Sequence, residues 1–249
     1  MAEEEKRRFG PDPETVIEAI RAGRGIDKVY IAKGETDAAL RAVASMARAA
    51  GAVVQEADRR KLDAMSVTHA HQGVLAIAAI KEYATVEEIH ARALERGETP
   101  LVVLCDEIED PHNLGAIIRT AECVGAHGVI IPKRRSAGVT PIVEKTSAGA
   151  VEHMAIARVS NMTNTIKDLK KMGYWIFGAA AEGKSRLWDT DFTGATAIVI
   201  GSEGGGMSRL VQENCDVLVS IPRSGKINSL NASASAAVLL YEVVRQRGR

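Results

Sequence analysis

The chain has 249 residues, 46% of them hydrophobic and 4% aromatic, and its 32 Lys and Arg residues balance 32 Asp and Glu. No apolar run approaches the ~20 residues that span a bilayer, and the charged N-terminus predicts no secretory signal. The neutral balance gives no general attraction to nucleic acid. Three cysteines without C-x-x-C spacing (Cys105, Cys123 and Cys215) argue against a disulfide framework or a zinc site. We therefore expect a cytoplasmic protein without a metal or a membrane anchor.

Residues 8–80 are predicted to form a small α/β unit. Asp12 and Pro13 have the pattern of an N-cap followed by a first-turn proline, so a helix is expected to begin at Pro13. Gly51 ends a second, alanine-rich helix. Helices are predicted over 13–22, 37–50 and 59–65, and strands over 28–32, 52–55 and 73–79.

Residues 81–98 are predicted to link this unit to the rest of the chain. Thr85 and Glu88 have capping-box spacing ahead of a helix over 89–96, which Gly97 ends. The high charge density predicts a mostly exposed connector, whose helix can still dock on either neighbouring domain.

In residues 99–249, short apolar runs alternate with helical patterns. The runs are four or five residues long and rich in β-branched residues, which is typical of buried parallel strands. This alternation predicts a doubly wound α/β domain with ligand sites outside the carboxyl ends of its strands. Strands are expected over 101–104, 128–131, 174–177, 197–200 and 217–221, and helices over 114–124, 141–148, 162–172, 208–213 and 229–247.

Three polar segments of this domain are candidates for a ligand site. Residues 200–208 (IGSEGGGMS) and 221–233 (IPRSGKINSLNAS) follow apolar strands, and residues 113–121 (NLGAIIRTA) lie at the start of a helix. Such loops place backbone N–H groups around a polar ligand. The sequence lacks a G-x-G-x-x-G after its first strand, a Walker A lysine, a G-x-S-x-G elbow and an H-E-x-x-H pattern. These absences disfavour the corresponding enzyme classes.

Together the three segments resemble the signature of the SpoU (TrmH-type) RNA ribose methyltransferases. Phe9–Gly10, His71–Gly73 and Asp110–Gly115 resemble the RlmB-type branch, which methylates a guanosine 2′-hydroxyl in large-subunit ribosomal RNA. The resemblance implies a SPOUT fold: an α/β methyltransferase domain with a mostly parallel sheet and a deep C-terminal trefoil knot, behind a small N-terminal α/β RNA-binding domain. It also implies S-adenosylmethionine as cofactor, RNA as partner and a homodimer that completes the site. The implied domains are 8–80 for RNA binding, 81–98 as linker and 99–249 for methyl transfer.

The resemblance also implies roles for individual residues. Arg119 is expected nearest the transferred methyl group, and the family resemblance suggests it as the base. A guanidinium stays protonated in almost any protein, so the alternative is that Arg119 clamps the target phosphate and stabilises the alkoxide, while Ser229, Asn231 or water takes the proton. The implied catalytic set is Asn113, Arg119, Glu203, Ser229 and Asn231, and the implied cofactor pocket is lined by Ile200, Gly201, Ser202, Glu203, Gly204, Ile221 and Leu230.

Each of these residues alone also has a simpler interpretation. Asn113 would be the N-cap of a helix beginning at Leu114, and Ser229 and Asn231 would cap the last helix. The order and spacing of the whole set favour the enzyme instead. Two functions remain as alternatives: a tRNA or resistance-type rRNA methyltransferase of the same family, and a non-catalytic RNA-binding or ribosome-assembly protein.

Because the net charge is zero, contacts to RNA must come from local basic clusters. Most such clusters are only solvated surface. The candidates are Lys6–Arg8, Arg59–Lys61, Lys133–Arg135, and Arg223 with Lys226.

Overall fold

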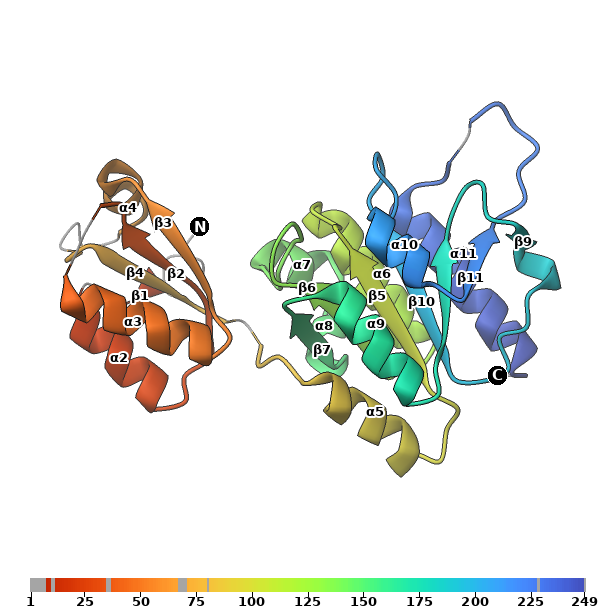
Figure 1. The fold of residues 1–249 in the computed structure, drawn as a ribbon, viewed down its shortest axis with the longest axis horizontal. Coiled ribbons are helices and arrows are strands. Elements are labelled where there is room, and N and C mark those ends of the chain that lie inside the picture. The colour runs from red at the N-terminus through yellow and green to blue at the C-terminus, as the bar shows by residue number, and fades with distance from the viewer. Residues whose placement is uncertain are drawn as a thin grey trace. The chain divides into compact units, whose positions relative to one another are not determined.

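A computed structural model of the chain describes residues 8–9, 12–34, 37–66, 71–79, 81–227 and 229–248. The chain divides into two compact units, residues 1–82 and residues 83–249 (Figure 1). In the described part, no helix has the length and apolar character needed to cross a bilayer.

The small unit is a four-stranded sheet with helices on both faces. Its strand order is β1-β4-β2-β3, with β2 parallel to β3 and β4 antiparallel to β1 and β2. Val29 and Ile31 of β2 pack on one face with apolar residues of α2 and α3, and Tyr30 packs on the other face with Leu62 of α4. The elements are β1 (Arg8–Phe9), α2 (Pro13–Arg21), β2 (Ile26–Ala32), α3 (Ala38–Ala49), β3 (Val53–Ala57), α4 (Arg59–Met65) and β4 (Val74–Ala78).

The expected elements of this unit are present, and the predicted N-cap of α2 is confirmed. Asp12 accepts a hydrogen bond from the Thr15 N–H over 2.8 Å. The short strand β1, which pairs Phe9 with Ala76, was not predicted. A strand of two residues is too short to show an alternation of apolar and polar positions in the sequence. It is recognised only from its pairing with β4.

The segment predicted as a linker contains α5 (Val86–Glu95), which begins with the expected capping box between Thr85 and Glu88. Ile89 is fully buried, and its side chain fills the space beside Gly128, where an added Cβ would lie 2.5 Å from it. The helix is therefore part of the larger unit, packs into it through one face and exposes the other. The functional domain limits stay a prediction.

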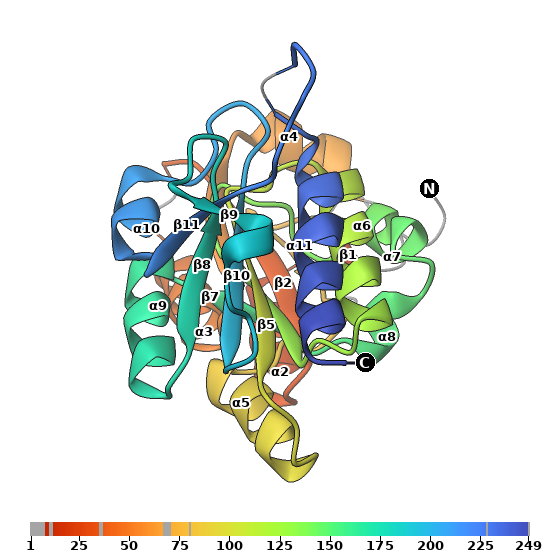
Figure 2. The ribbon, with the colours of Figure 1, turned by 90° about the vertical axis from the view of Figure 1, so that its right-hand side faces the viewer.

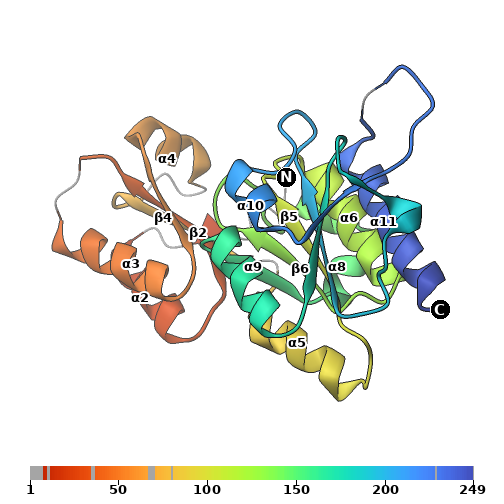
Figure 3. The same cartoon turned by 45° about the vertical axis from the view of Figure 1, so that its right-hand side comes forward.

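The large unit has a seven-stranded parallel sheet in the order β7-β6-β5-β10-β8-β11-β9. Figures 2 and 3 show α6 and α11 side by side on one face of this sheet, and α9 and α10 on the other. The strands are β5 (Leu101–Asp106), β6 (Gly128–Pro132), β7 (Ile156–Val159), β8 (Trp175–Ala179), β9 (Ser185–Arg186), β10 (Thr196–Gly201) and β11 (Val217–Ser220). The helices are α6 (Pro111–Cys123), α7 (Pro141–Thr146), α8 (Ala150–His153), α9 (Met162–Lys171), the 3-10 turn η1 (Leu187–Asp189), α10 (Arg209–Asn214) and α11 (Ala232–Gln246).

The five predicted strands are all present, whereas the short strands β7 and β9 were missed. The helix predicted over 141–148 ends at Thr146, since Ala148 and Gly149 have φ values of 51° and 84°, and α8 begins after them. The architecture is the predicted parallel α/β domain, and the knot stays a prediction. Because β5, β8, β10 and β11 are parallel, the loops that follow them meet at one edge of the sheet.

Candidate active site

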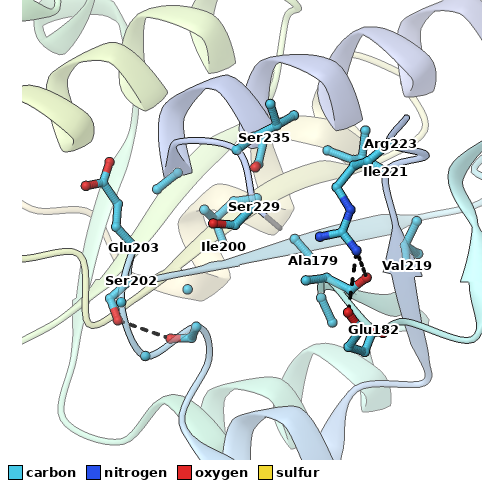
Figure 4. Close-up of a pocket in the computed structure, with 18 residues that line it drawn as sticks. Ala179, Glu182, Ile200, Ser202, Glu203, Val219, Ile221, Arg223, Ser229 and Ser235 are labelled. Atoms are coloured by element: carbon cyan, nitrogen blue, oxygen red, sulfur yellow. Dashed lines mark hydrogen bonds and ion pairs between the residues drawn. The ribbon is translucent and has the colours of Figure 1, made fainter. Parts of the chain in front are cut away.

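A cavity of about 440 Å³ lies at the carboxyl ends of β8, β10 and β11 (Figure 4). All seven residues predicted to contact the cofactor line it, together with Ser229. The remaining lining residues come from the ends of β8 and β11 and the loops after them, from the loop after β10 and from the start of α11: Ala179, Ala180, Ala181, Glu182, Gly205, Gly206, Val219, Arg223, Ala232 and Ser235.

One wall of this cavity is the glycine loop, residues 201–206. The loop closes on itself, since Ser202 and Gly206 exchange two backbone hydrogen bonds of 3.0 and 2.9 Å. Gly201 is required here, because an added Cβ would lie 2.2 Å from the carbonyl carbon of Gly206 and from the nitrogen of Met207. Gly206 has a φ of 65°, a conformation that favours glycine. The loop thus presents backbone groups to the cavity at close range.

The opposite rim joins two loops that are far apart in sequence. Arg223 donates to the carbonyl oxygen of Ala181 over 3.1 Å and lies 3.5 Å from a carboxylate oxygen of Glu182 (Figure 4). Arg223 is also one of the residues of the candidate basic cluster, and the structure places its guanidinium at this rim. The Ala179–Glu182 wall was also missed. This wall follows the strand predicted over 174–177. That strand lies in the sheet between the strands predicted over 197–200 and 217–221, which carry the other two walls.

Three of the predicted catalytic residues form one hydrogen-bonded group beside the cavity. The Asn113 amide donates to Glu203 Oε1 over 3.0 Å, and Asn113 Oδ1 accepts from Asn231 Nδ2 over 2.9 Å. Asn231 Nδ2 also donates to Glu203 Oε1. The three predicted segments therefore meet at a single polar cluster.

Local sequence explains how these side chains are placed. Asp110, not Asn113, caps α6, because Asp110 accepts from the His112 N–H over 3.0 Å and Pro111 takes the first helical position. The capping interpretation of Asn113 was therefore wrong, and its side chain, only 7% exposed, is free to reach Glu203. Asn231 does cap α11 through Oδ1, which accepts from the Ser233 N–H over 2.9 Å.

A second cavity of about 320 Å³ adjoins the first and shares Ser202 and Glu203 with it. It lies against the start of α6 and the loop after β5. Its lining is strongly acidic and consists of Glu107, Ile108, Glu109, Asp110, Asn113, Ser202 and Glu203. The polar cluster therefore stands between two hollows, one glycine-rich and one acidic.

Arg119 is not brought to this cluster within the chain. It is exposed on α6, lines neither cavity and forms no hydrogen bond or ion pair with the part of the chain that the structure describes. Six helical residues separate it from Asn113, which corresponds to about 9 Å along the axis and about 120° around it. A single chain therefore brings together only part of the predicted catalytic set, without Arg119.

The other basic clusters belong to the small unit and to the loop after β6 of the large unit. Arg59–Lys61 lie on α4 of the small unit, and most of Lys6–Arg8 falls outside the described residues. In the loop after β6, Arg135 forms an ion pair of 3.3 Å with Glu107 of the acidic cavity. Both residues have left-handed backbones, with φ values of 53° and 57°. This contact ties the basic loop to the rim of the site.

The sequence and the fold both match known proteins. The sequence model of the SpoU rRNA Methylase family matches residues 100–241, and a model described as RNA 2′-O ribose methyltransferase substrate binding matches residues 13–84. A putative TrmH family tRNA/rRNA methyltransferase of Bacillus subtilis, YacO, is 45% identical over 232 residues, which is 93% of each chain. A putative TrmH family tRNA/rRNA methyltransferase of Staphylococcus saprophyticus is 44% identical over the same share of both chains.

Among solved structures, the SpoU methyltransferase AviRb from Streptomyces viridochromogenes, in complex with the cofactor AdoMet, superposes with a TM-score of 0.62. The two proteins are 27% identical, and the match covers 97% of this chain and 91% of AviRb. The family match spans most of the large unit, and the relatives cover the chain nearly from end to end. The chain therefore belongs to the SpoU (TrmH) family of RNA methyltransferases.

Proposed function

We propose that the protein transfers a methyl group from S-adenosylmethionine to a ribose 2′-hydroxyl of RNA, with a guanosine of large-subunit ribosomal RNA as the target. The observation that carries this proposal is the meeting of the three predicted segments at one polar cluster beside the cavity, where Asn113, Glu203 and Asn231 are hydrogen-bonded to one another. A protein that only bound RNA would have no use for this arrangement.

The cavity suits S-adenosylmethionine in size and chemistry. Its volume of about 440 Å³ lies in the usual range of about 300–1,000 Å³ for small-molecule sites. Ile200, Ile221 and Leu230 offer an apolar bed for a purine ring, and the glycine loop offers backbone donors and acceptors for its edges. AviRb, which shares the fold, was solved with AdoMet. When bound, this cofactor supplies an electrophilic methyl group.

The residues around the polar cluster have distinct proposed tasks. Glu203 accepts hydrogen bonds from two amides and thereby orients Asn113 and Asn231 toward the boundary of the two cavities. The ribose is proposed to enter from the acidic side. Its hydroxyl proton is taken by Ser229, Asn231 or water, and Arg119 holds the adjacent phosphate and stabilises the alkoxide.

Because Arg119 is outside both cavities of its own chain, we propose that a second copy supplies it in a homodimer. An exposed apolar stripe on α11 supports this arrangement. Ala234 and Tyr241 are exposed, Tyr241 by 55%, and Val238 between them is half-buried. The helix α11 itself lies beside α6, which carries Arg119 (Figure 2). A solvent-exposed apolar face of this kind fits a protein–protein contact.

The small unit is proposed to hold the RNA substrate, as the description of its matching family model suggests. Lys28 and Lys61 place their ammonium groups 5.6 and 5.3 Å from the centre of the Tyr30 ring. Neither ammonium has a carboxylate partner among the described residues. Both are therefore available for phosphates on the face that also carries Arg59 and Arg60 of α4. We propose a cytoplasmic location, which an RNA substrate supports.

The direct test is methyl transfer from labelled S-adenosylmethionine to total RNA that lacks its ribose methylations, with Arg119→Ala beside the wild type. We expect label in large-subunit rRNA as 2′-O-methylguanosine, lost in the variant. Label in tRNA, or at another rRNA nucleotide, would retain the chemistry and replace the target. No label in naked RNA or in assembled subunits would favour an RNA-binding protein without catalysis.

A further inference from the structure

Asp106, the last residue of β5, carries a buried carboxylate that forms no hydrogen bond with the cluster of Asn113, Glu203 and Asn231. It is 3% exposed and lines neither of the two cavities, so it contacts no ligand there. Burial raises the pKa of the Asp106 carboxyl, while a hydrogen bond from the Ser208 backbone N–H lowers it. A buried carboxylate is costly unless its hydrogen bonds are satisfied. The hydrogen bond that the Asp106 carboxylate accepts from the Ser208 N–H is therefore expected to have a structural role.

That contact joins Asp106 to the exit of the glycine loop. The Ser208 N–H donates to Asp106 Oδ2 over 2.7 Å. The entrance of the same loop is fixed by the backbone of Asp106, because Gly201 is its register partner in the β5–β10 ladder. One residue therefore holds both ends of the loop, the entrance through its backbone and the exit through its side chain.

Met207 completes the closure between these two points. It is buried against Gly178 of β8, where an added Cβ would lie 2.7 Å from the Met207 Cε. The Ser202–Gly206 hydrogen bonds close the loop on itself but do not attach it to the sheet. At the exit, the Met207 side chain and the Asp106–Ser208 hydrogen bond attach the loop to the sheet just before α10 begins.

We propose that Asp106 is a positioning residue that holds the glycine loop in its ligand-binding shape. Glu203 lies on this loop, and its bonds to Asn113 and Asn231 require the loop to stay where the tether puts it. Loss of the tether therefore disturbs both the cofactor wall and the polar cluster. The inference rests on the proposed function, since it treats the cavity as the cofactor site.

The first measurement is S-adenosylmethionine affinity by calorimetry for Asp106→Ala, which removes the acceptor, and Asp106→Asn, which keeps a neutral one. Hydrogen bonds to a charged acceptor are about twice as strong as neutral ones, so the Asn variant is expected between the wild type and the Ala variant. The dissociation constant should rise about tenfold or more in Asp106→Ala. If Asp106→Ala fails to fold, the change in the dissociation constant of Asp106→Asn still tests the tether.

Asp216 provides a matched control at the opposite edge of the same sheet. It accepts from the Ile176 N–H over 2.9 Å and is also a carboxylate that tethers a neighbouring strand. Asp216→Ala is expected to lower thermal stability and to leave cofactor affinity within about twofold of the wild type, because the effects of distant, independent sites are separable. Equal cofactor affinity in the wild type and both Asp106 variants would overturn the tether.

Hydrogen exchange of the amides of residues 202–208, measured without cofactor, separates the tether from the proposed function. Asp106→Ala should speed exchange in this segment, and Asp216→Ala should not. If the wild type bound no cofactor while the exchange changed as expected, the proposed function would fail and the tether would stand. Unchanged exchange in Asp106→Ala would contradict the tether whatever the wild type binds.

Discussion

Asn113 Oδ1 accepts a hydrogen bond from Asn231 Nδ2 over 2.9 Å, across 118 residues of sequence. This bond joins the first turn of α6 to the N-cap of α11, and both amides also donate to Glu203. Asn231 divides its amide between two tasks, because its oxygen caps α11 and its nitrogen serves the cluster.

The division of labour within Asn231 predicts that stability and activity can be separated. Asn231→Asp keeps the capping oxygen but replaces the donor with a second carboxylate beside Glu203. Since Asn and Asp are similar N-caps, the cap of α11 should be kept, and the free energy of unfolding should fall only through the lost donor and the repulsion between the two carboxylates. Methyl transfer should fall about a hundredfold. Asn231→Ala places no charge beside Glu203 but loses the cap, which should cost about 1 kcal/mol. Urea unfolding and initial rates measure the two effects, and full activity in Asn231→Asp would exclude the donor role.

If Arg119 acts from the second copy, two inactive variants should rescue each other. In a mixed dimer of Arg119→Ala and Asn231→Asp chains, one site has a normal Asn231 and receives a normal Arg119 from the partner. A refolded equal mixture should then regain about a quarter of wild-type activity, since half of the dimers are mixed and one of their two sites is intact. Activity is measured before and after refolding together. If the arginine served its own chain, the mixture would stay as inactive as either parent.

Arg119→Lys distinguishes the two roles considered for the arginine. A phosphate clamp depends on the planar, two-pronged guanidinium, which an ammonium group cannot reproduce. We expect kcat to fall about a hundredfold in the lysine variant, nearly as far as in Arg119→Ala. A base would instead profit from the lower pKa of lysine, and activity would then recover as the pH is raised. A rate profile from neutral to alkaline pH decides between them.

Features that depend on neighbouring residues, such as helix starts, could be predicted from the sequence. The Asp12–Pro13 pair marked the start of α2 correctly, and the Thr85–Glu88 capping box is confirmed, because capping depends only on neighbouring residues; α5 nevertheless begins at Val86 and not at the predicted residue 89. The helix start at 111 was misplaced to 114 although Asp110–Pro111 repeats the pattern of Asp12–Pro13. That error came from giving Asn113, rather than Asp110, the capping role.

Contacts between segments that are distant in the sequence could not be predicted from such local patterns. Arg223 looked like part of a basic surface cluster, yet it donates to Ala181, 42 residues earlier. Asp106 follows the strand predicted over 101–104, and nothing near it in the sequence indicates Ser208 as its partner. The resemblance supplied the members of the polar cluster, but only the order of strands in the sheet determines which of them meet.

Gly201→Ala tests whether the cavity wall depends on close packing of the glycine loop. The added Cβ would lie 2.2 Å from backbone atoms of Gly206 and Met207, which have no side-chain freedom with which to yield. Cofactor affinity measured by equilibrium dialysis should fall more than about tenfold. Gly194→Ala, in the loop before the same strand, has open space around the new methyl group and should bind normally. Normal affinity in Gly201→Ala would contradict the proposed cofactor wall.

His127 should make the stability of the large unit depend on pH. Its Nδ1 accepts from the Leu101 N–H over 3.0 Å, so the ring is neutral with its proton on Nε2, facing Glu98. Burial lowers the pKa of His127 below its usual 6.5, although Glu98 opposes this shift. Between the two pKa values the unfolded chain binds the additional proton, so this stabilisation is complete above pH 6.5 and declines as the pH falls below it. Urea unfolding between about pH 5 and pH 8 should therefore show a decline in the wild type that is smaller in His127→Asn, whose amide oxygen can still accept from Leu101. An equal decline in both proteins would assign the pH dependence to other groups.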